Sequence, residues 1–363
     1  MKKYLILIIG LSIITAISVF FYIKGHNSLI PNYPFIITGL VTGMLIILGG
    51  CELFANGVEC LSDRLNLSHA TAGSLLAAVG TALPETMIPV IALLAGKAEY
   101  KEGIAVGAIL GAPFMLSTLA MFLLGITVLT LKFLNKRIAP QMNVNIKALT
   151  FELRFFIIVM STILIVSLLK IKSLNYILGT ALLLSYTGFI FYTLKHESIE
   201  GEEYTEHFHF GFFLGCPRKF GWIIGQVLVG LFFIIIGSHL FVEYISIFSI
   251  RSGIPALILS LLIAPVATEL PEKFNSITWT IKGKDTIAMA NITGAMVFQS
   301  TLPVSIGLFF TNWDINITEV LNMTFALSMG LLIMLFASIK KKIPALLLIT
   351  GGIFYLIYII KAI

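Results

Sequence analysis

Apolar segments of membrane-spanning length follow one another along the chain, and short polar stretches separate them. A helix needs about 20 mainly apolar residues to cross the hydrocarbon core of a bilayer. The segments that meet this requirement after residue 30 are 34–61, 69–96, 102–131, 152–170, 174–194, 221–249, 254–281, 285–311, 317–339 and 343–362. The pattern predicts an all-α polytopic membrane protein with ten core transmembrane helices.

One more apolar run, from Tyr4 to Ile23, follows the basic pair Lys2 and Lys3 at the start of the chain. It is longer than the apolar region of a signal peptide, and no small-residue cleavage site follows it before Lys24. We therefore predict an extra transmembrane helix or a signal anchor within residues 1–27.

The amino-acid composition supports a membrane protein and argues against a soluble domain or a nucleic-acid-binding protein. The chain is 58% hydrophobic and 12% charged, with a mean hydropathy of +1.00, which excludes an ordinary soluble domain. The net charge of +6 would suggest a nucleic-acid partner in a soluble protein. Here the basic residues lie in short loops, mostly on the side of the N-terminus, so they indicate a cytoplasmic N-terminus in a multi-pass cell-membrane protein with no nucleic-acid partner.

The chain contains an internal repeat, in which Val79–Met115 resembles Val266–Gln299. The matched pairs at an offset of 187 are Thr81 with Thr268, Leu83 with Leu270, Pro84 with Pro271 and Glu85 with Glu272. After a gap the match resumes at an offset of 183, from Lys101 with Lys284 to Leu119 with Leu302. Upstream, Gly43 and Gly50 match Gly230 and Gly237 at the first offset.

Equivalent helices of the repeat lie five spans apart, an odd number, so the two halves must enter the membrane in opposite senses. The sequence therefore predicts two inverted five-helix halves, 34–194 and 221–363. Folds of this kind place a shared site near the membrane midplane and expose it alternately to the two sides. We expect the helices at 34–61 and 221–249 to be the ones that slide.

The segment 195–220 between the halves is hydrophilic. It is rich in acidic and histidine side chains: His196, Glu197, Glu200, Glu202, Glu203, Glu206, His207 and His209. We interpret it as a solvated cytoplasmic linker, with metal sensing as an alternative.

The repeated motif places acids inside apolar helices. Glu85 and Glu272 would lie in hydrocarbon, where carboxylates are costly and are usually functional. Each follows a proline, whose missing N–H leaves a carbonyl one turn back without a donor. Carboxylates, free carbonyls and the hydroxyls of Thr81 and Thr268 are the oxygen ligands that Ca²⁺ and Na⁺ prefer. The motif thus predicts a cation site.

Lys273 is unusual in such a motif, because it adds a positive charge beside the predicted ligand Glu272. It stands four residues after Glu269, the spacing of a helical Glu–Lys pair, so the two side chains could be a structural couple. Alternatively, the ammonium occupies a cation position or titrates during transport, leaving fewer ions bound.

Other membrane acids have less defined roles. Glu52 and Glu59 lie seven residues apart and share one helix face, so they are candidates for an ion path. We expect Glu152 and Arg154, near a helix start, to reach the membrane interface. We interpret Gly80, Gly107, Gly111 and Gly294 as close-packing positions between helices.

Both repeats resemble the α-repeats of the sodium/calcium exchanger family within the calcium:cation antiporter superfamily. The resemblance rests on the T-x-L-P-E motifs and the glycine-bearing helices that follow, over about Gly43–Thr118 and Gly230–Thr301. It implies that Glu85 and Glu272 are the central cation ligands, assisted by Thr81, Thr268 and Asn291. Glu269 is a further ligand candidate.

This sequence departs from the family pattern at several polar positions. Ala82 and Glu269 stand where the family has serine, and Ala108 stands opposite Asn291. The two Gly-Ser-Asn triplets of the family are Gly111-Ala112-Pro113 and Gly294-Ala295-Met296 here. The missing ligands bear on the number and kind of ions that this chain would bind.

We predict a secondary active antiporter that exchanges Ca²⁺ for Na⁺ by alternating access at a midplane site formed by two glutamates. The alternatives are a proton-coupled exchanger of Ca²⁺ or another divalent cation, and a degenerate homologue that transports nothing. An enzyme is disfavoured, because the repeats offer the acids no Ser, His or Cys partner. We expect a monomer that needs no cofactor and has inorganic cations and the lipid bilayer as partners.

Overall fold

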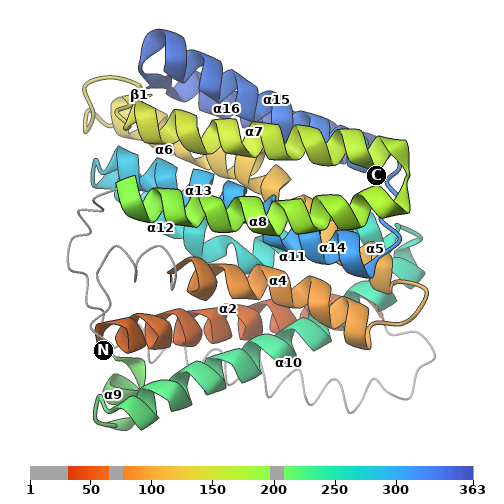
Figure 1. Cartoon of the computed structure of the whole chain (residues 1–363). Helices are drawn as coiled ribbons and strands as arrows, with labels where there is room; N and C mark the ends of the chain where they lie inside the picture. The colour runs from red at the N-terminus through yellow and green to blue at the C-terminus, as the bar shows by residue number, and fades with distance from the viewer. Residues whose placement is uncertain (1–31, 65–76, 197–207, 363) are drawn as a thin grey trace. The chain divides into compact units, whose positions relative to one another are not determined.

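The computed structural model describes residues 32–64, 77–196 and 208–362, and this part of the chain is almost entirely helical (Figure 1). The helices of the first sequence half are α2 (Tyr33–Arg64), α4 (Ala77–Ala95), α5 (Lys101–Met115), the π-helical turn η2 (Leu116–Ala120), α6 (Met121–Phe133), α7 (Ile146–Leu169) and α8 (Lys172–His196). Those that follow are α9 (His209–Leu214), α10 (Phe220–Ser252), α11 (Ala256–Thr268), α12 (Leu270–Ile281), α13 (Asp285–Gln299), α14 (Leu302–Phe310), α15 (Ile317–Lys340) and α16 (Ala345–Ala362).

Eight helical stretches in the described part of the chain are long and apolar enough to cross a membrane. They agree with eight of the ten predicted spans. The other two, 69–96 and 254–281, carry the repeated motif: α4 is described from Ala77 onward, and the second is divided into α11 and α12 at Glu269. The predicted N-terminal helix (1–27) and residues 197–207 of the acidic linker lie outside the described residues.

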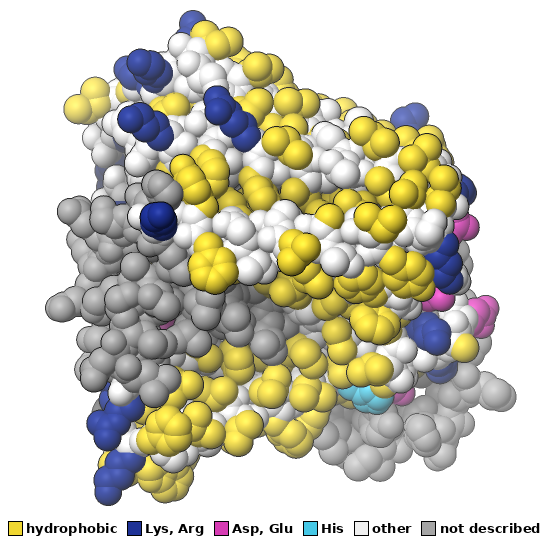
Figure 2. Space-filling view, viewed as in Figure 1, with side chains coloured by type: hydrophobic (Ala, Val, Ile, Leu, Met, Phe, Trp, Pro, Cys, Tyr) yellow, Lys and Arg dark blue, Asp and Glu magenta, His cyan; other side chains and the backbone are white. Residues whose placement is uncertain are grey.

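The surface of α7 and α8 shows how these helices suit a bilayer. Large apolar side chains are exposed along both helices: Ile158, Ile165, Leu168, Tyr176, Ile177 and Leu184. Figure 2 shows such apolar side chains along the middle of the helices, with Lys and Arg side chains gathered toward the helix ends. An apolar band between basic ends is the surface expected of lipid-facing helices.

The helices form two compact units, and each unit takes helices from both sequence halves. Of the described residues, unit 1 comprises 32–64, 77–105, 190–196 and 208–260, and unit 2 comprises 106–189 and 261–362.

In unit 1, α2 packs along α10 through glycines that the repeat places at equivalent positions. A Cβ atom added at Gly50 would lie 2.8 Å from the backbone nitrogen of Ile234, and one added at Gly230 would lie 2.6 Å from that of Phe54. Such contacts let two helix backbones touch, which is typical of packing in membranes. Helices α2 and α10, which we expect to slide, are therefore packed directly against each other through glycines.

In unit 2, polar contacts fix the loops between the apolar helices. The short antiparallel strands β1 (Gln141–Met142) and β2 (Ile343–Pro344) pair next to the starts of α7 and α16. Arg137 forms an ion pair with the buried carboxylate of Asp285 at the start of α13, and the backbone N–H of Asn143 donates to the same oxygen at 2.7 Å. These contacts tie the segment between α6 and α7 to the start of α13.

Candidate functional site

The second copy of the motif lies where α11 ends and α12 begins. Glu269 sits between the two helices with φ −96° and ψ 6°, outside regular helical geometry. Pro271 follows at the start of α12 and has no N–H to donate to the preceding turn. The helix is therefore interrupted at Glu269, three residues before Glu272 in the first turn of α12.

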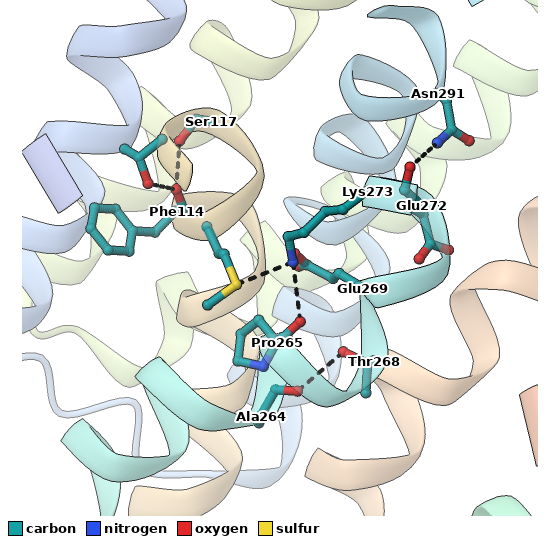
Figure 3. A network of polar contacts seen from close by, with 11 residues as sticks. Phe114, Ser117, Ala264, Pro265, Thr268, Glu269, Glu272, Lys273 and Asn291 are labelled. Carbon is teal, nitrogen blue, oxygen red and sulfur yellow. Dashed lines mark hydrogen bonds and ion pairs between the residues drawn. The ribbon is translucent and has the colours of Figure 1, made fainter. Parts of the chain in front are cut away.

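Lys273 and Glu269 form an ion pair in the interior of unit 2 (Figure 3). The Lys273 Nζ lies 2.9 Å from Glu269 Oε2, and the two side chains are only 5% and 1% exposed. The ammonium also donates to the carbonyl oxygen of Pro265 at 3.3 Å and lies 3.2 Å from the sulfur of Met115. The second carboxylate oxygen of Glu269 has no hydrogen-bond donor among the described residues.

Glu272 is also buried, with 5% of its surface exposed. Its backbone carbonyl accepts a hydrogen bond from Asn291 Nδ2 on α13 at 3.0 Å, and the same amide nitrogen donates to Ser276 Oγ at 2.9 Å. Glu272 Oε2 has no donor in the part of the chain that the structure describes. Asn291 thus positions the first turn of α12, and a carboxylate oxygen of Glu272 is left available to a cation.

Thr268 completes the polar group on this segment. Its side chain is buried, and its hydroxyl donates to the carbonyl of Ala264 at 3.4 Å, one turn back. Because that bond uses the hydrogen, the hydroxyl lone pairs remain free to accept or to coordinate. The residues that the structure brings together in unit 2 are therefore Thr268, Glu269, Glu272, Lys273 and Asn291.

The first copy of the motif lies on α4 in unit 1. Glu85 is buried there, with 7% of its surface exposed, and α4 contacts both α2 and α10. Thr81 lies on the same helix, one turn before Glu85. Because Glu85 belongs to unit 1 and Glu272 to unit 2, the meeting of the two carboxylates at one cation stays a prediction of the sequence.

The prediction for Glu152 was wrong. Its side chain is only 9% exposed and accepts a hydrogen bond from the hydroxyl of Thr293 on α13, whereas Arg154 is exposed. The helical period gives the reason, because Glu152 shares a face with the buried residues Leu149 and Phe156. This spacing was visible in the sequence and could have identified Glu152 as an interior acid.

The acids on α2 have a different setting. Glu52 is 58% exposed and lies 3.0 Å from the Nε2 atom of His209 on α9. Nearby, Gln226 on α10 donates to Asn56 on α2 at 2.9 Å, and the N–H of His209 donates to the same Asn56 oxygen at 3.1 Å. This network joins α9, which lies within the predicted linker 195–220, to both α2 and α10.

Sequence and structure comparisons place the chain among known transporters. A family model described as sodium/calcium exchanger protein matches residues 35–195 and 222–363. CaxA of Alkalimonas amylolytica, named as a candidate antiporter, is 24% identical over 271 residues, which cover 74% of this chain and 78% of CaxA. The uncharacterized membrane protein MJ0091 of Methanocaldococcus jannaschii is 22% identical over 299 residues, covering 82% of this chain and 89% of that protein.

Two solved structures have the same helical architecture. The H⁺/Ca²⁺ exchanger CAX aligns with a TM-score of 0.71 and 16% identity, over 98% of this chain and 88% of CAX. The sodium–calcium exchanger NCX_Mj aligns with a TM-score of 0.55 and 21% identity, over 89% of this chain and 98% of that one. These likenesses confirm the predicted fold class of an all-α membrane protein with two inverted repeats.

The family model covers both repeats and most of the chain, and it matches the segments that hold Glu85 and Glu272. Proteins of this family exchange cations across membranes and do not catalyse a chemical reaction. This chain therefore belongs to the sodium/calcium exchanger family and is a multi-pass cation antiporter of the cell membrane.

Proposed function

We propose that the protein exchanges Ca²⁺ for Na⁺ and that Glu272 and Glu85 are the acidic ligands of the Ca²⁺. The observation that carries the proposal is the carboxylate of Glu272. It is buried at a helix break, and its Oε2 atom has no hydrogen-bond donor among the described residues. A buried carboxylate oxygen without a donor is costly, and a hard divalent cation would satisfy it.

The remaining oxygens suit a cation that has to shed its water. Thr268 offers a hydroxyl, and Pro271 has no N–H to donate to a carbonyl of the preceding turn. Glu85, at the equivalent position of the repeat, supplies a second buried carboxylate. Two carboxylates balance the charge of one Ca²⁺, whereas Na⁺ would be bound by a carboxylate with neutral oxygens.

The names of the similar structures agree on Ca²⁺ and differ on the counter-ion. CAX is an H⁺/Ca²⁺ exchanger and NCX_Mj is a sodium–calcium exchanger. We favour Na⁺ as the counter-ion because neutral oxygen ligands lie beside the acids. Binding of a proton would require only the carboxylates and would leave these neutral oxygens without a role. The proton-coupled exchanger is the second candidate, and transport assays separate the two.

The test is ⁴⁵Ca²⁺ uptake into proteoliposomes under an imposed Na⁺ gradient, a pH gradient or neither. We expect uptake that requires the Na⁺ gradient. Uptake driven by the pH gradient without Na⁺ would replace Na⁺ with H⁺ as the counter-ion, and the absence of uptake under every gradient would refute the exchange of Ca²⁺.

The variants Glu272→Gln and Glu85→Gln test the ligands. Each replaces a charged oxygen with a neutral one of the same shape. The loss of a charged partner costs about 3 kcal/mol, so uptake at limiting Ca²⁺ should fall about 100-fold in each variant. Glu99→Gln, at an exposed position after α4, is the matched control and should keep wild-type uptake. Retention of uptake in either ligand variant would remove that residue from the site.

A further inference from the structure

The Lys273 ammonium has the surroundings of a bound cation. It is held by a carboxylate oxygen of Glu269, the carbonyl oxygen of Pro265 and the thioether of Met115, within 3.3 Å of all three (Figure 3). These groups come from α5, α11 and the residue between α11 and α12. The carboxylate and the carbonyl are ligands that a monovalent metal ion could also use.

The two halves of the repeat differ at this place. At the offset of 187, Glu269 corresponds to Ala82, and Lys273 corresponds to Thr86. The ion pair is therefore present in the second half alone, directly beside the predicted ligand Glu272. The carboxylate of Glu269 adds a negative charge to the site, and Lys273 cancels it from within the chain.

Stability alone gives a poor account of the pair. Both side chains are almost completely buried, and the cost of removing two charges from water commonly exceeds their mutual attraction. An apolar pair of similar volume would fill the same space without that cost. A role in setting the charge of the site explains why a lysine stands next to a cation ligand.

We propose that the Lys273 ammonium is a tethered cation that permanently fills a monovalent cation position at Glu269. This inference rests on the proposed function and specifies the number of ions that are exchanged. The protein binds one mobile monovalent cation fewer per transport cycle than it would if Glu269 had no lysine partner. The position remains occupied throughout transport, because its cation is covalently attached.

The test variant is Lys273→Met, which keeps an unbranched chain and removes the charge. In proteoliposomes, the membrane potential and Na⁺ gradient at which net Ca²⁺ flux is zero report the number of Na⁺ ions exchanged per Ca²⁺. We expect this number to rise by one in Lys273→Met. An unchanged number in a variant that still transports Ca²⁺ would overturn the proposal.

A second readout does not depend on transport. Thermal unfolding of the purified full-length protein is compared in NaCl and in choline chloride. We expect Lys273→Met to gain a stabilisation by Na⁺ beyond that of the wild type, because a mobile ion replaces the ammonium. The double variant Glu269→Gln/Lys273→Met removes both charges and should lose this gain.

The outcomes keep this inference separate from the proposed function. If the wild type transports no Ca²⁺, the proposed exchange fails, but the added effect of Na⁺ on Lys273→Met can still support or overturn the tethered cation. A Lys273→Met protein that folds only in Na⁺ supports the proposal. One that is equally destabilised or unfolded in both salts makes the pair a structural couple and overturns it.

Discussion

Helix α4 and the α11–α12 segment carry the same sequence motif, but their backbones differ. α4 is helical without interruption from Ala77 to Ala95, whereas the second copy leaves helical geometry at Glu269. Both copies have a proline directly before the glutamate, so the proline alone does not decide the difference. The second copy also carries Pro265 and the Glu269–Lys273 pair.

The helices that follow the motif also differ, because one is continuous and the other is interrupted. In the first half, α5 continues through the π-helical turn η2 into α6, and in the second half the helix stops at Ser300 and Thr301 before α14. Pro303, in the first turn of α14, prevents the continuation that Ala120 allows at the equivalent position. π-Helical turns are frequent at functional sites.

The Ser-Thr pair common to both halves stabilises both kinds of irregularity. Ser117 and Thr118 donate to the carbonyl of Phe114 at 3.0 and 2.5 Å. In the second half, Ser300 and Thr301 donate to the carbonyl of Val297 at 3.0 and 2.9 Å. The hydroxyls satisfy carbonyls that a regular helix would satisfy with backbone N–H groups. The same Ser-Thr sequence therefore makes the same kind of side-chain hydrogen bond in both halves. The backbone nevertheless forms a π-helical turn in the first half and ends a helix in the second.

The largest stability difference between the halves is expected at the equivalent glycines Gly111 and Gly294. A Cβ atom at Gly111 would lie 2.2 Å from the carbonyl oxygen of Leu261, whereas one at Gly294 would meet no atom of the described residues within 4 Å. Gly111→Ala must push two backbones apart and should cost about 1–3 kcal/mol. Gly294→Ala lies in the interior of α13, where alanine is the better helix former, so it should raise the free energy of unfolding by about 0.5–1 kcal/mol.

Thermal unfolding in detergent measures both variants, and each serves as the matched control of the other. Equal destabilisation would contradict the asymmetry of the two halves. The close-packing interpretation of the glycines is supported by the contact at Gly111, whereas at Gly294 the described residues leave space for a Cβ atom.

Much of the fold could be predicted because its determinants are local and periodic. The apolar runs set the helices, and the odd number of spans between the repeats sets the inversion. The break at Glu269 was less accessible, because Pro84 and Pro271 are equivalent in sequence and yet α4 is continuous. The π-helical turn was missed for the same reason, since Ser-Thr occurs in both halves and only the backbone distinguishes them.

The candidate site was predicted in part. The spacing of Glu269 and Lys273 indicated a pair, and the structure forms it. No pattern in the sequence indicated that the carbonyl of Pro265 and the sulfur of Met115 would also contact the ammonium, because Met115 comes from another helix. For Glu152, the position near a helix start predicts the membrane interface, but the helical period of its buried neighbours Leu149 and Phe156 places it in the interior.

A smaller asymmetry concerns the hydroxyl of Thr293, which donates to the buried carboxylate of Glu152. Its equivalent in the first half is Leu110, which has no hydroxyl to donate. Thr293→Val keeps the shape of the side chain and removes the donor, so Glu152 would lose this partner in the interior. The loss of a hydrogen bond to a buried charged group costs about 1–3 kcal/mol, which should lower the melting temperature by several degrees.

Thr162→Val on α7 is the control for this effect, because Thr162 is exposed and its hydroxyl donates only to the carbonyl of Ile158 in its own helix. It should leave the melting temperature within about a degree, since an exposed substitution rarely exceeds 0.5 kcal/mol. The double variant Thr293→Val/Glu152→Gln measures the coupling between the partners. If the effects of the two substitutions on the free energy of unfolding are additive, the Thr293 hydroxyl does not stabilise the Glu152 carboxylate. This difference between the halves would then have no energetic consequence.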